Sequence, residues 1–205
     1  GTITLDGQDV TRMPDYRRSK FIGRMFQDPL KGTAPNMTIE ENLALCYLRA
    51  SQRRSPFSMI SKAERREFRD RLAQLGLGLE NRMDSLVGLL SGGQRQALTL
   101  LMATLQKPQL LLLDEHTAAL DPKTASKVLD ATQRIVEQDH LTTLMITHNM
   151  RDAIAYGNRL VMMYDGHIVV DVSGEEKKRL TVEQLLELFS KASGSDEADD
   201  KLILS

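Results

Sequence analysis

Two neighbouring carboxylates end an unbroken run of leucines in the string Leu110-Leu-Leu-Leu-Asp114-Glu115. An all-apolar run this short resembles a buried parallel strand, and open α/β sheets bind ligands beyond the carboxyl ends of such strands. Asp114 could hold Mg²⁺, partly through water, because this ion prefers oxygen ligands. Glu115 could then act as a general base that polarises an attacking water. A strand that merely ends in solvated acids is the alternative for this motif taken alone.

A second candidate site is the glycine-bearing turn Ser91-Gly92-Gly93, which leads into a helix expected from Gln94 to Leu105. Such a turn presents backbone N–H groups and a hydroxyl without obstruction by side chains, and the helix dipole adds partial positive charge. The turn therefore suits an anion such as a phosphate. For Ser-Gly-Gly alone, an ordinary helix N-cap with flexible glycines is the alternative.

Gln27 and His148 each end another expected strand. Gln27 closes a strand over residues 21–27, which Asp28-Pro29 stops, and His148 follows a buried strand expected over 141–147. An imidazole in this place can donate a hydrogen bond to a phosphate oxygen or orient a water held by a carboxylate. Taken alone, a turn glutamine and a structural histidine are the alternatives.

Elements of both kinds must position these residues, and their order predicts an α/β fold. Capping boxes that begin at Thr38 and Ser61 predict helices to about Ala50 and Leu75. We expect a mainly parallel sheet with flanking helices, a small antiparallel β part and an α-helical subdomain. The other expected elements are hairpins at 1–10 and 159–172, turning at Asp6-Gly7 and Asp165-Gly166, and helices at 13–18, 122–138, 150–156 and 185–192.

The composition limits the classes of function. The chain has 205 residues, 41% of them apolar and 27% charged, and its net charge of −1 gives no general attraction to nucleic acid or anionic lipid. No apolar run approaches the about 20 residues of a membrane-spanning helix, so we expect membrane association only through a partner. Cys46 is alone, which excludes an internal disulfide and a multi-cysteine metal site and fits a reducing cytoplasm.

The whole string Leu90-Ser-Gly-Gly-Gln-Arg-Gln96 resembles the signature sequence of ABC ATPases. Other motifs follow in the order of that family. Gln27 resembles its Q-loop glutamine, the strand ending in Asp114-Glu115 resembles its Walker B strand, Ala118–Asp121 resembles its D-loop, and His148 resembles its switch histidine. The resemblance extends over nearly the whole chain, and the joint match is far more specific than any of its parts.

The resemblance implies a P-loop NTPase-like fold and the ATP-hydrolysing subunit of an ABC transporter, with ATP and Mg²⁺ bound. It implies a head-to-tail dimer with a second ATPase subunit, in which Ser91 and Gly93 of one copy contact the γ-phosphate bound to the other. Transmembrane permease subunits at the inner face of a bacterial membrane are the implied partners, and import is the implied direction of transport. The residues implied are Glu115, His148 and Gln27 for catalysis, Ser91, Gly92, Gly93, Gln94 and Asp121 for ATP contact, and Asp114 and Gln27 for the metal.

With this resemblance, residues 1–36 and 91–192 are expected to form the ATPase core. Residues 37–90 are expected to form the helical subdomain, and residues 193–205 a flexible acidic tail.

The sequence departs from the family in its phosphate-binding loop. Gly-x-x-x-x-Gly-Lys-Ser/Thr is absent, since no Gly-Lys dipeptide occurs in these 205 residues. We expect about 40 to 50 further residues ahead of Gly1, the scale of a βα unit, to carry that loop. The chain by itself is therefore expected to be inactive, to expose apolar surface around Leu110–Leu113 and Leu144–Ile146, and to compensate by self-association.

A second departure is His116, which follows the Asp-Glu pair where many family members have proline. The string Asp-Glu-His-Thr resembles a subset of bacterial importer ATPases, some linked to aromatic amino acids. We interpret His116 as a neutral loop histidine without catalytic duty. Two other functions stay open: a soluble ABC ATPase of DNA repair or translation, and a binding-only module that completes a partner's nucleotide pocket.

Overall fold

The computed structural model describes residues 1–50 and 60–193, and the predicted tail lies outside the described residues except for Ser193. The chain divides into two compact units, Gly1–Ile146 and Thr147–Ser205, and each is described by itself. Our division into an ATPase core and a helical subdomain stays a prediction.

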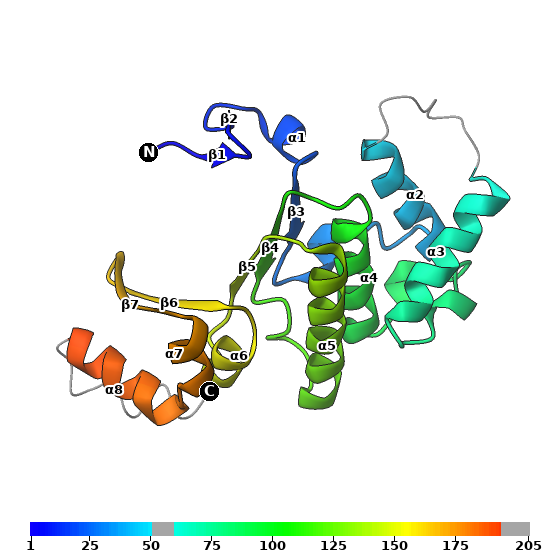
Figure 1. Cartoon of the computed structure of the whole chain (residues 1–205). Helices are drawn as coiled ribbons and strands as arrows, with labels where there is room; N and C mark the ends of the chain where they lie inside the picture. Colours follow the sequence, from blue (N-terminus) through cyan, green and yellow to red (C-terminus); the bar gives the residue numbers. More distant parts are fainter. Residues whose placement is uncertain (51–59, 194–205) are drawn as a thin grey trace. The chain divides into compact units, whose positions relative to one another are not determined.

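A parallel sheet lies at the centre of the first unit (Figure 1). Its strand order is β3 (Ile22–Met25), β4 (Leu110–Asp114) and β5 (Thr143–Ile146), and both pairings are parallel. Helical segments separate these strands in sequence, as parallel pairing requires. The predicted parallel sheet is confirmed, and the carboxyl ends of its three strands meet at one edge.

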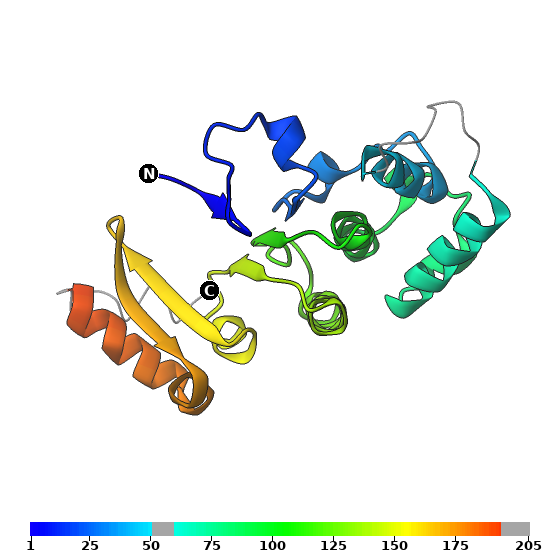
Figure 2. The ribbon, with the colours of Figure 1, turned by 45° about the horizontal axis from the view of Figure 1, so that its top comes forward.

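Two helices, α4 (Gly92–Thr104) and α5 (Pro122–Asp139), lie side by side along one face of this sheet (Figures 1 and 2). The alternate residues Leu111 and Leu113 of β4 point toward them and are buried in the main hydrophobic core. The approach of β3 to α4 is close. A Cβ on Gly23 would lie 2.5 Å from the carbonyl oxygen of Ala103, so this position requires glycine.

The segment between β3 and α4 is helical, as predicted. It contains α2 (Ile39–Ala50) and α3 (Lys62–Gln74). Both predicted capping boxes are present: Glu41 N–H donates to Thr38 Oγ1 (3.2 Å), and Glu64 N–H donates to Ser61 Oγ (3.2 Å). Apolar side chains of both helices share one core with the sheet and α4. The short elements of the first unit are β1 (Thr4–Leu5), β2 (Gln8–Asp9), α1 (Asp15–Arg18), and the 3₁₀ helices η1 (Pro29–Gly32), η2 (Leu79–Asn81) and η3 (Val87–Leu89).

The second unit is a β-hairpin packed against helices. The antiparallel strands β6 (Arg159–Tyr164) and β7 (His167–Ser173) turn at Asp165-Gly166, whose φ angles of 46° and 77° suit the predicted turn. Buried residues of the hairpin form a small core with Leu185 of α8. The helices of this unit are α6 (Met150–Ala155), α7 (Gly174–Arg179) and α8 (Val182–Ser193).

Helix α7 was not predicted, because its Gly-Glu-Glu-Lys-Lys-Arg sequence has no apolar periodicity. A buried lysine anchors it instead. Lys177 is 3% exposed, and its ammonium donates to the carbonyl oxygens of Ile154 and Tyr156 at the end of α6. Desolvation lowers the pKa of Lys177, while the carbonyl groups supply the compensating hydrogen bonds. None of the described helices is both long enough and apolar enough to cross a bilayer.

The prediction of a buried strand over 141–147 is wrong for one face of β5. Leu144 and Ile146 are 57% and 53% exposed, whereas Met145 between them packs against the main core. The reason is that α4 and α5 pack on one face of the sheet, and Leu144 and Ile146, which alternate with Met145, point to the other face. This exposure agrees with the expected apolar surface at Leu144 and Ile146. The expected exposure around Leu110–Leu113 is wrong for Leu111 and Leu113, which are buried.

The buried and the exposed face of the sheet predict different losses of stability when a leucine is replaced by alanine. Leu111→Ala removes a fully buried side chain and should lower the free energy of unfolding by about 2–5 kcal/mol. Leu144→Ala removes an exposed side chain and should lower it by less than about 1 kcal/mol. Urea denaturation of both variants measures the difference. The measurement is made at a protein concentration low enough for the chain to be monomeric, where equal losses would mean that Leu144 is covered within its own chain and would contradict the exposed face.

Candidate active site

Gln27 and Glu115 meet where β3 and β4 end. The two strands run in parallel with Met25 opposite Leu113, so the residues that follow them leave the sheet at the same edge. Gln27 Nε2 donates a hydrogen bond of 3.0 Å to Glu115 Oε2, across 88 positions of sequence. Because the amide nitrogen is directed at Glu115, the carbonyl oxygen of Gln27 is the atom that can face a cation.

Asp114 is the last residue of β4 and has a cation beside it that the sequence did not reveal. Arg24 Nη2 lies 3.7 Å from Asp114 Oδ2, and its guanidinium lies 4.5 Å from the centroid of the Phe26 ring. Arg24 is opposite Leu112 in the parallel register, so it shares a face with Asp114. The side chains of the pair are 54% and 43% exposed, so the pair contributes at most about 1 kcal/mol to stability.

The backbone at Glu115 is strained. Its φ of 43° lies in the left-handed region, which costs a residue other than glycine about 1–3 kcal/mol and persists only when surrounding contacts fix it. Two hydrogen bonds do so here: Glu115 N–H donates to the carbonyl oxygen of Ile146 (3.0 Å), and Ala118 N–H donates to that of Glu115 (3.1 Å). The carboxylate is thus held on a rigid support at the end of β4.

His116, the next residue, turns into the protein. It is 3% exposed, and its Nε2 lies 3.3 Å from Thr132 Oγ1 on α5. Burial lowers the pKa of His116 to about 4, so its imidazole is neutral at neutral pH. The neutral state agrees with the interpretation from sequence, but the burial under the loop was not anticipated, since loop residues are usually exposed.

The Ser-Gly-Gly segment forms the start of α4, which corrects the predicted start of that helix at Gln94. The helix begins at Gly92. Ser91 is its N-cap: Gln94 N–H donates to Ser91 Oγ (3.3 Å), and Ser91 N–H donates to Gln94 Oε1 (3.2 Å). This capping box closes the first turn around both glycines, and it outweighs their low helix propensity. By the geometry of a helix start, the N–H groups of Gly92 and Gly93 have no acceptor within the helix. Gly92 is exposed, whereas Gly93 is buried.

The start of α4 packs against the start of α5. A Cβ on Gly93 would lie 1.9 Å from Thr124 Cγ2, and one on Gly92 would lie 3.4 Å from Leu120 Cδ2. Asp121 caps α5 by accepting from Thr124 N–H (3.1 Å). Hydrogen bonds from the side chain and the backbone of Thr124 lower the pKa of Asp121. The structure therefore brings the signature residues beside the segment Ala118–Asp121. No feature of the sequence indicated Thr124, because its contact with Gly93 depends on how two helices pack.

His148 lies in the second unit and is exposed there. It directly precedes Asn149, whose side chain caps α6 by accepting from Arg151 N–H (2.9 Å) and Asp152 N–H (3.2 Å). Desolvation raises the pKa of Asp152, and the charge of His148 opposes that shift. His148 follows β5 closely in sequence, and its role toward Glu115 stays a prediction.

The donor atoms at the edge of the sheet fit Mg²⁺ in part. The carboxylate of Asp114 and the amide oxygen of Gln27 are hard oxygen ligands of the kind that this ion takes. Within residues 1–50 and 60–193, no cluster of three or more His, Cys, Asp or Glu side chains could hold a metal ion by itself. Mg²⁺ usually takes one or two protein carboxylates and completes its shell with water and substrate phosphates, so the set is compatible with it.

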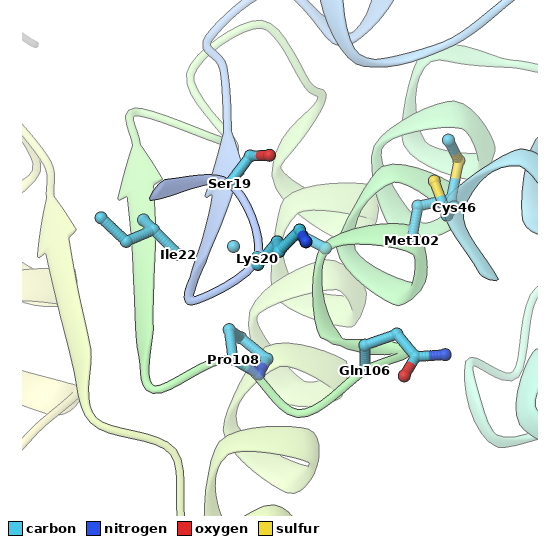
Figure 3. Close-up of a pocket in the computed structure, with 9 residues that line it drawn as sticks. Ser19, Lys20, Ile22, Cys46, Met102, Gln106 and Pro108 are labelled. Carbon is cyan, nitrogen blue, oxygen red and sulfur yellow. The ribbon is translucent and has the colours of Figure 1, made fainter. Parts of the chain in front are cut away.

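A small cavity lies at the opposite edge of the sheet (Figure 3). It lies where β3 and β4 begin, and its volume of about 20 Å³ is enough for one water molecule. Its lining includes Ser19, Lys20, Ile22, Cys46, Met102, Gln106 and Pro108. Because none of the candidate site residues lines it, this cavity is not the active site.

Comparison with known proteins agrees with this geometry. The family model described as ABC transporter matches residues 1–118. The chain is 45% identical to a tyrosine transport ATP-binding protein of Clostridioides difficile (strain R20291), over 94% of this chain and 76% of that protein. It is 34% identical to the sulfate/thiosulfate import ATP-binding protein CysA of Mycobacterium tuberculosis (strain ATCC 25618 / H37Rv), over 82% of this chain but only 44% of that protein.

Solved structures give the same assignment. The ATP-binding cassette MJ0796, in a dimeric post-hydrolysis state bound to ADP and Pi, superposes with a TM-score of 0.68 at 25% identity, over 84% of this chain and 73% of that one. A second dimeric structure of MJ0796, a bacterial ABC transporter cassette, gives the same score at 27% identity and the same coverage. With a family model over more than half of its length and a relative 45% identical, the chain belongs to the ABC transporter family and has the fold of its ATP-binding cassettes.

Proposed function

We propose that this chain is the ATP-binding and hydrolysing subunit of an ABC transporter and powers solute transport through partner transmembrane subunits. The observation that carries the proposal is the hydrogen bond between Gln27 and Glu115, beside Asp114, at the carboxyl edge of a parallel sheet. Ligands of open α/β sheets bind at this edge. The tyrosine and sulfate transport relatives support a transporter over the DNA-repair or translation alternative.

In the proposed mechanism, Glu115 is the general base. Its carboxylate accepts a proton from a water molecule as the water oxygen attacks the γ-phosphorus, and the bond from that phosphorus to the ADP oxygen breaks. Gln27 holds the carboxylate through Oε2, and the strained backbone fixes the point from which it projects. His148 is proposed to donate a hydrogen bond to a γ-phosphate oxygen.

Asp114 and the carbonyl oxygen of Gln27 are the proposed protein ligands of Mg²⁺. When bound, this ion neutralises charge that develops on the phosphate oxygens. Arg24 keeps Asp114 charge-compensated at 3.7 Å, and the guanidinium must yield for Asp114 to take a metal or its water. Because both side chains are about half exposed, separating Arg24 from Asp114 costs little free energy.

Ser91, Gly92, Gly93 and Gln94 are proposed to act on ATP held by a second ATPase subunit. The free N–H groups of a helix start, with Gly92 exposed there, and the dipole of α4, a helix of 13 residues, suit the γ-phosphate. Asp121, at the adjacent start of α5, is proposed to lie at the same dimer contact. The dimeric MJ0796 cassettes, to which this chain is similar in fold, support a dimer.

The loop that holds the ATP phosphates is proposed to come from a segment outside these 205 residues, which contain no Gly-Lys dipeptide. The identity of 45% to a tyrosine transport protein favours import of an amino acid, although the partner subunits select the solute. Binding to those subunits would place the chain at the cytoplasmic face of the membrane.

Without a phosphate-binding loop, the 205-residue chain should hydrolyse no ATP at steady state and should elute larger than a monomer, because Leu144 and Ile146 are exposed. Phosphate release and size-exclusion chromatography with light scattering measure both. The control is the tyrosine transport ATP-binding protein of Clostridioides difficile, measured in the same two assays. A stable monomer that turns over ATP would contradict the expectation.

Glu115→Gln keeps the shape of the side chain and removes its basicity. In the encoded protein with its phosphate-binding loop, it should lower the rate of hydrolysis by about 10²–10⁴-fold and leave ATP affinity nearly unchanged. Phosphate release and equilibrium binding of a fluorescent ATP analogue separate the two. Glu176→Gln, at an exposed position of α7, is the control and should affect neither hydrolysis nor ATP affinity. Normal hydrolysis by Glu115→Gln would rule out Glu115 as the base.

Ser91 and Ser61 offer a matched pair, because each is the N-cap of a capping box. Replacing either with alanine should lower the free energy of unfolding by about 1 kcal/mol. Only Ser91→Ala should abolish hydrolysis, and it should spare nucleotide binding. Urea denaturation, ATP binding and phosphate release in the encoded protein test this. If Ser91→Ala hydrolysed ATP as well as Ser61→Ala does, the role of Ser91 toward a partner's ATP would be wrong.

A further inference from the structure

His116 is a polar residue buried directly beside the proposed general base. It is 3% exposed, and Thr132, which it contacts, is 5% exposed. Thr132 lies on the inner face of α5 among Val128, Leu129 and Ala131. Burying two polar side chains costs free energy unless they bond to each other, whereas apolar side chains would fill the same space without needing a partner. What the pair adds is a directional bond between a loop and a helix.

The direction of that bond follows from counting protons. Thr132 Oγ1 lies 2.8 Å from the carbonyl oxygen of Val128, which can only accept. The hydroxyl has one proton, which it donates to that carbonyl oxygen. The oxygen of the same hydroxyl, 3.3 Å from His116 Nε2, is therefore the acceptor of the second bond. His116 Nε2 must therefore carry the proton and donate. The geometry assigns the imidazole to the Nε2–H tautomer.

The tether acts on a short loop that is constrained at both ends. The loop covers residues 115–121, begins with the strained backbone of Glu115 and ends at Asp121, the N-cap of α5. Its beginning is bonded to β5 through Glu115 N–H, and its end is bonded to the first turn of α5. His116 adds a bond from the loop to the middle of α5, 16 positions further along the chain. This bond prevents rotation of the loop about its two ends.

We propose that His116 is a positioning residue of the hydrolytic site, which ties the loop to Thr132 so that the carboxylate of Glu115 stays directed at Gln27. The inference rests on the proposed function of Glu115. His116 touches neither the water nor the nucleotide in this proposal. It acts through the backbone it shares with Glu115, and its loss misplaces the base while leaving the nucleotide contacts in place.

Paired substitutions in the encoded protein with its phosphate-binding loop test the proposal. Thr132→Val keeps the shape of the side chain and removes the acceptor, and Thr132→Ser keeps the hydroxyl. Thr132→Val and His116→Leu should each lower kcat about 10- to 100-fold, because a small misplacement of a catalytic group has that effect, while KM for ATP changes less than about threefold. Thr132→Ser should stay within about threefold of the unsubstituted enzyme.

Two controls separate positioning from general loss of stability. The double variant His116→Leu/Thr132→Val should be no slower than either single variant, because all three lack the same bond. Ser61→Ala, which weakens the N-cap of α3 away from the site, should lower stability in urea without lowering kcat. Normal kcat in Thr132→Val, or equal defects in Thr132→Ser and Thr132→Val, would overturn the proposal.

A spectroscopic readout keeps this inference distinct from the proposed function. Long-range ¹H–¹⁵N spectra of the unsubstituted chain should show His116 with its proton on Nε2, and a proton on Nδ1 would refute the bond. The backbone amide signals of Glu115 and Ala118 should shift in Thr132→Val and not in Thr132→Ser. If the unsubstituted protein hydrolysed no ATP even with its phosphate-binding loop present, the proposed function would fail, and these signals would still decide whether the tether holds the loop.

Discussion

The parallel pairing of β3 with β4 is the interaction on which the site depends. Met25 lies opposite Leu113, so both strands end together, and Gln27 and Glu115 leave the same edge within hydrogen-bonding distance. A slip of one residue would turn every side chain of β3 to the other face and separate the pair. Packing on α4 fixes the register, because a one-residue slip would turn Met25 out of the core and place a side chain where only Gly23 fits against Ala103.

Local signals were sufficient to predict most elements. The capping boxes at Thr38 and Ser61, the Asp-Gly turns and the leucine run of β4 all have causes within a few residues of sequence. The errors arise where a distant contact decides. The start of α4 follows from the closure of a cap around two glycines, the exposed face of β5 from the packing of α4 and α5 on the other face, and α7 from the burial of Lys177.

The candidate site shows the same division. The family resemblance was enough to predict that Gln27 and Glu115 serve one site, and the parallel pairing of their strands brings them together. Arg24 and His116 could not be assigned in this way. The first approaches Asp114 only once the register of β3 is known, and the second finds Thr132 only once α5 is packed. Neither contact has a pattern in the sequence, since each joins residues from different elements.

The loop 115–121 connects two groups of residues that act on different phosphates in the proposed dimer. It begins at Glu115, which would serve the ATP of its own subunit, and ends at Asp121, whose helix packs on Gly93, which would serve the partner's ATP. A side chain at position 93 would collide with Thr124, so the start of α4 lies in close contact with the start of α5. The loop before α5 is in turn bonded to β5 through Glu115 and to α5 through His116. One short, multiply bonded segment therefore joins the proposed base to the helix start that packs on the signature turn, so a substitution in this loop is expected to affect both groups.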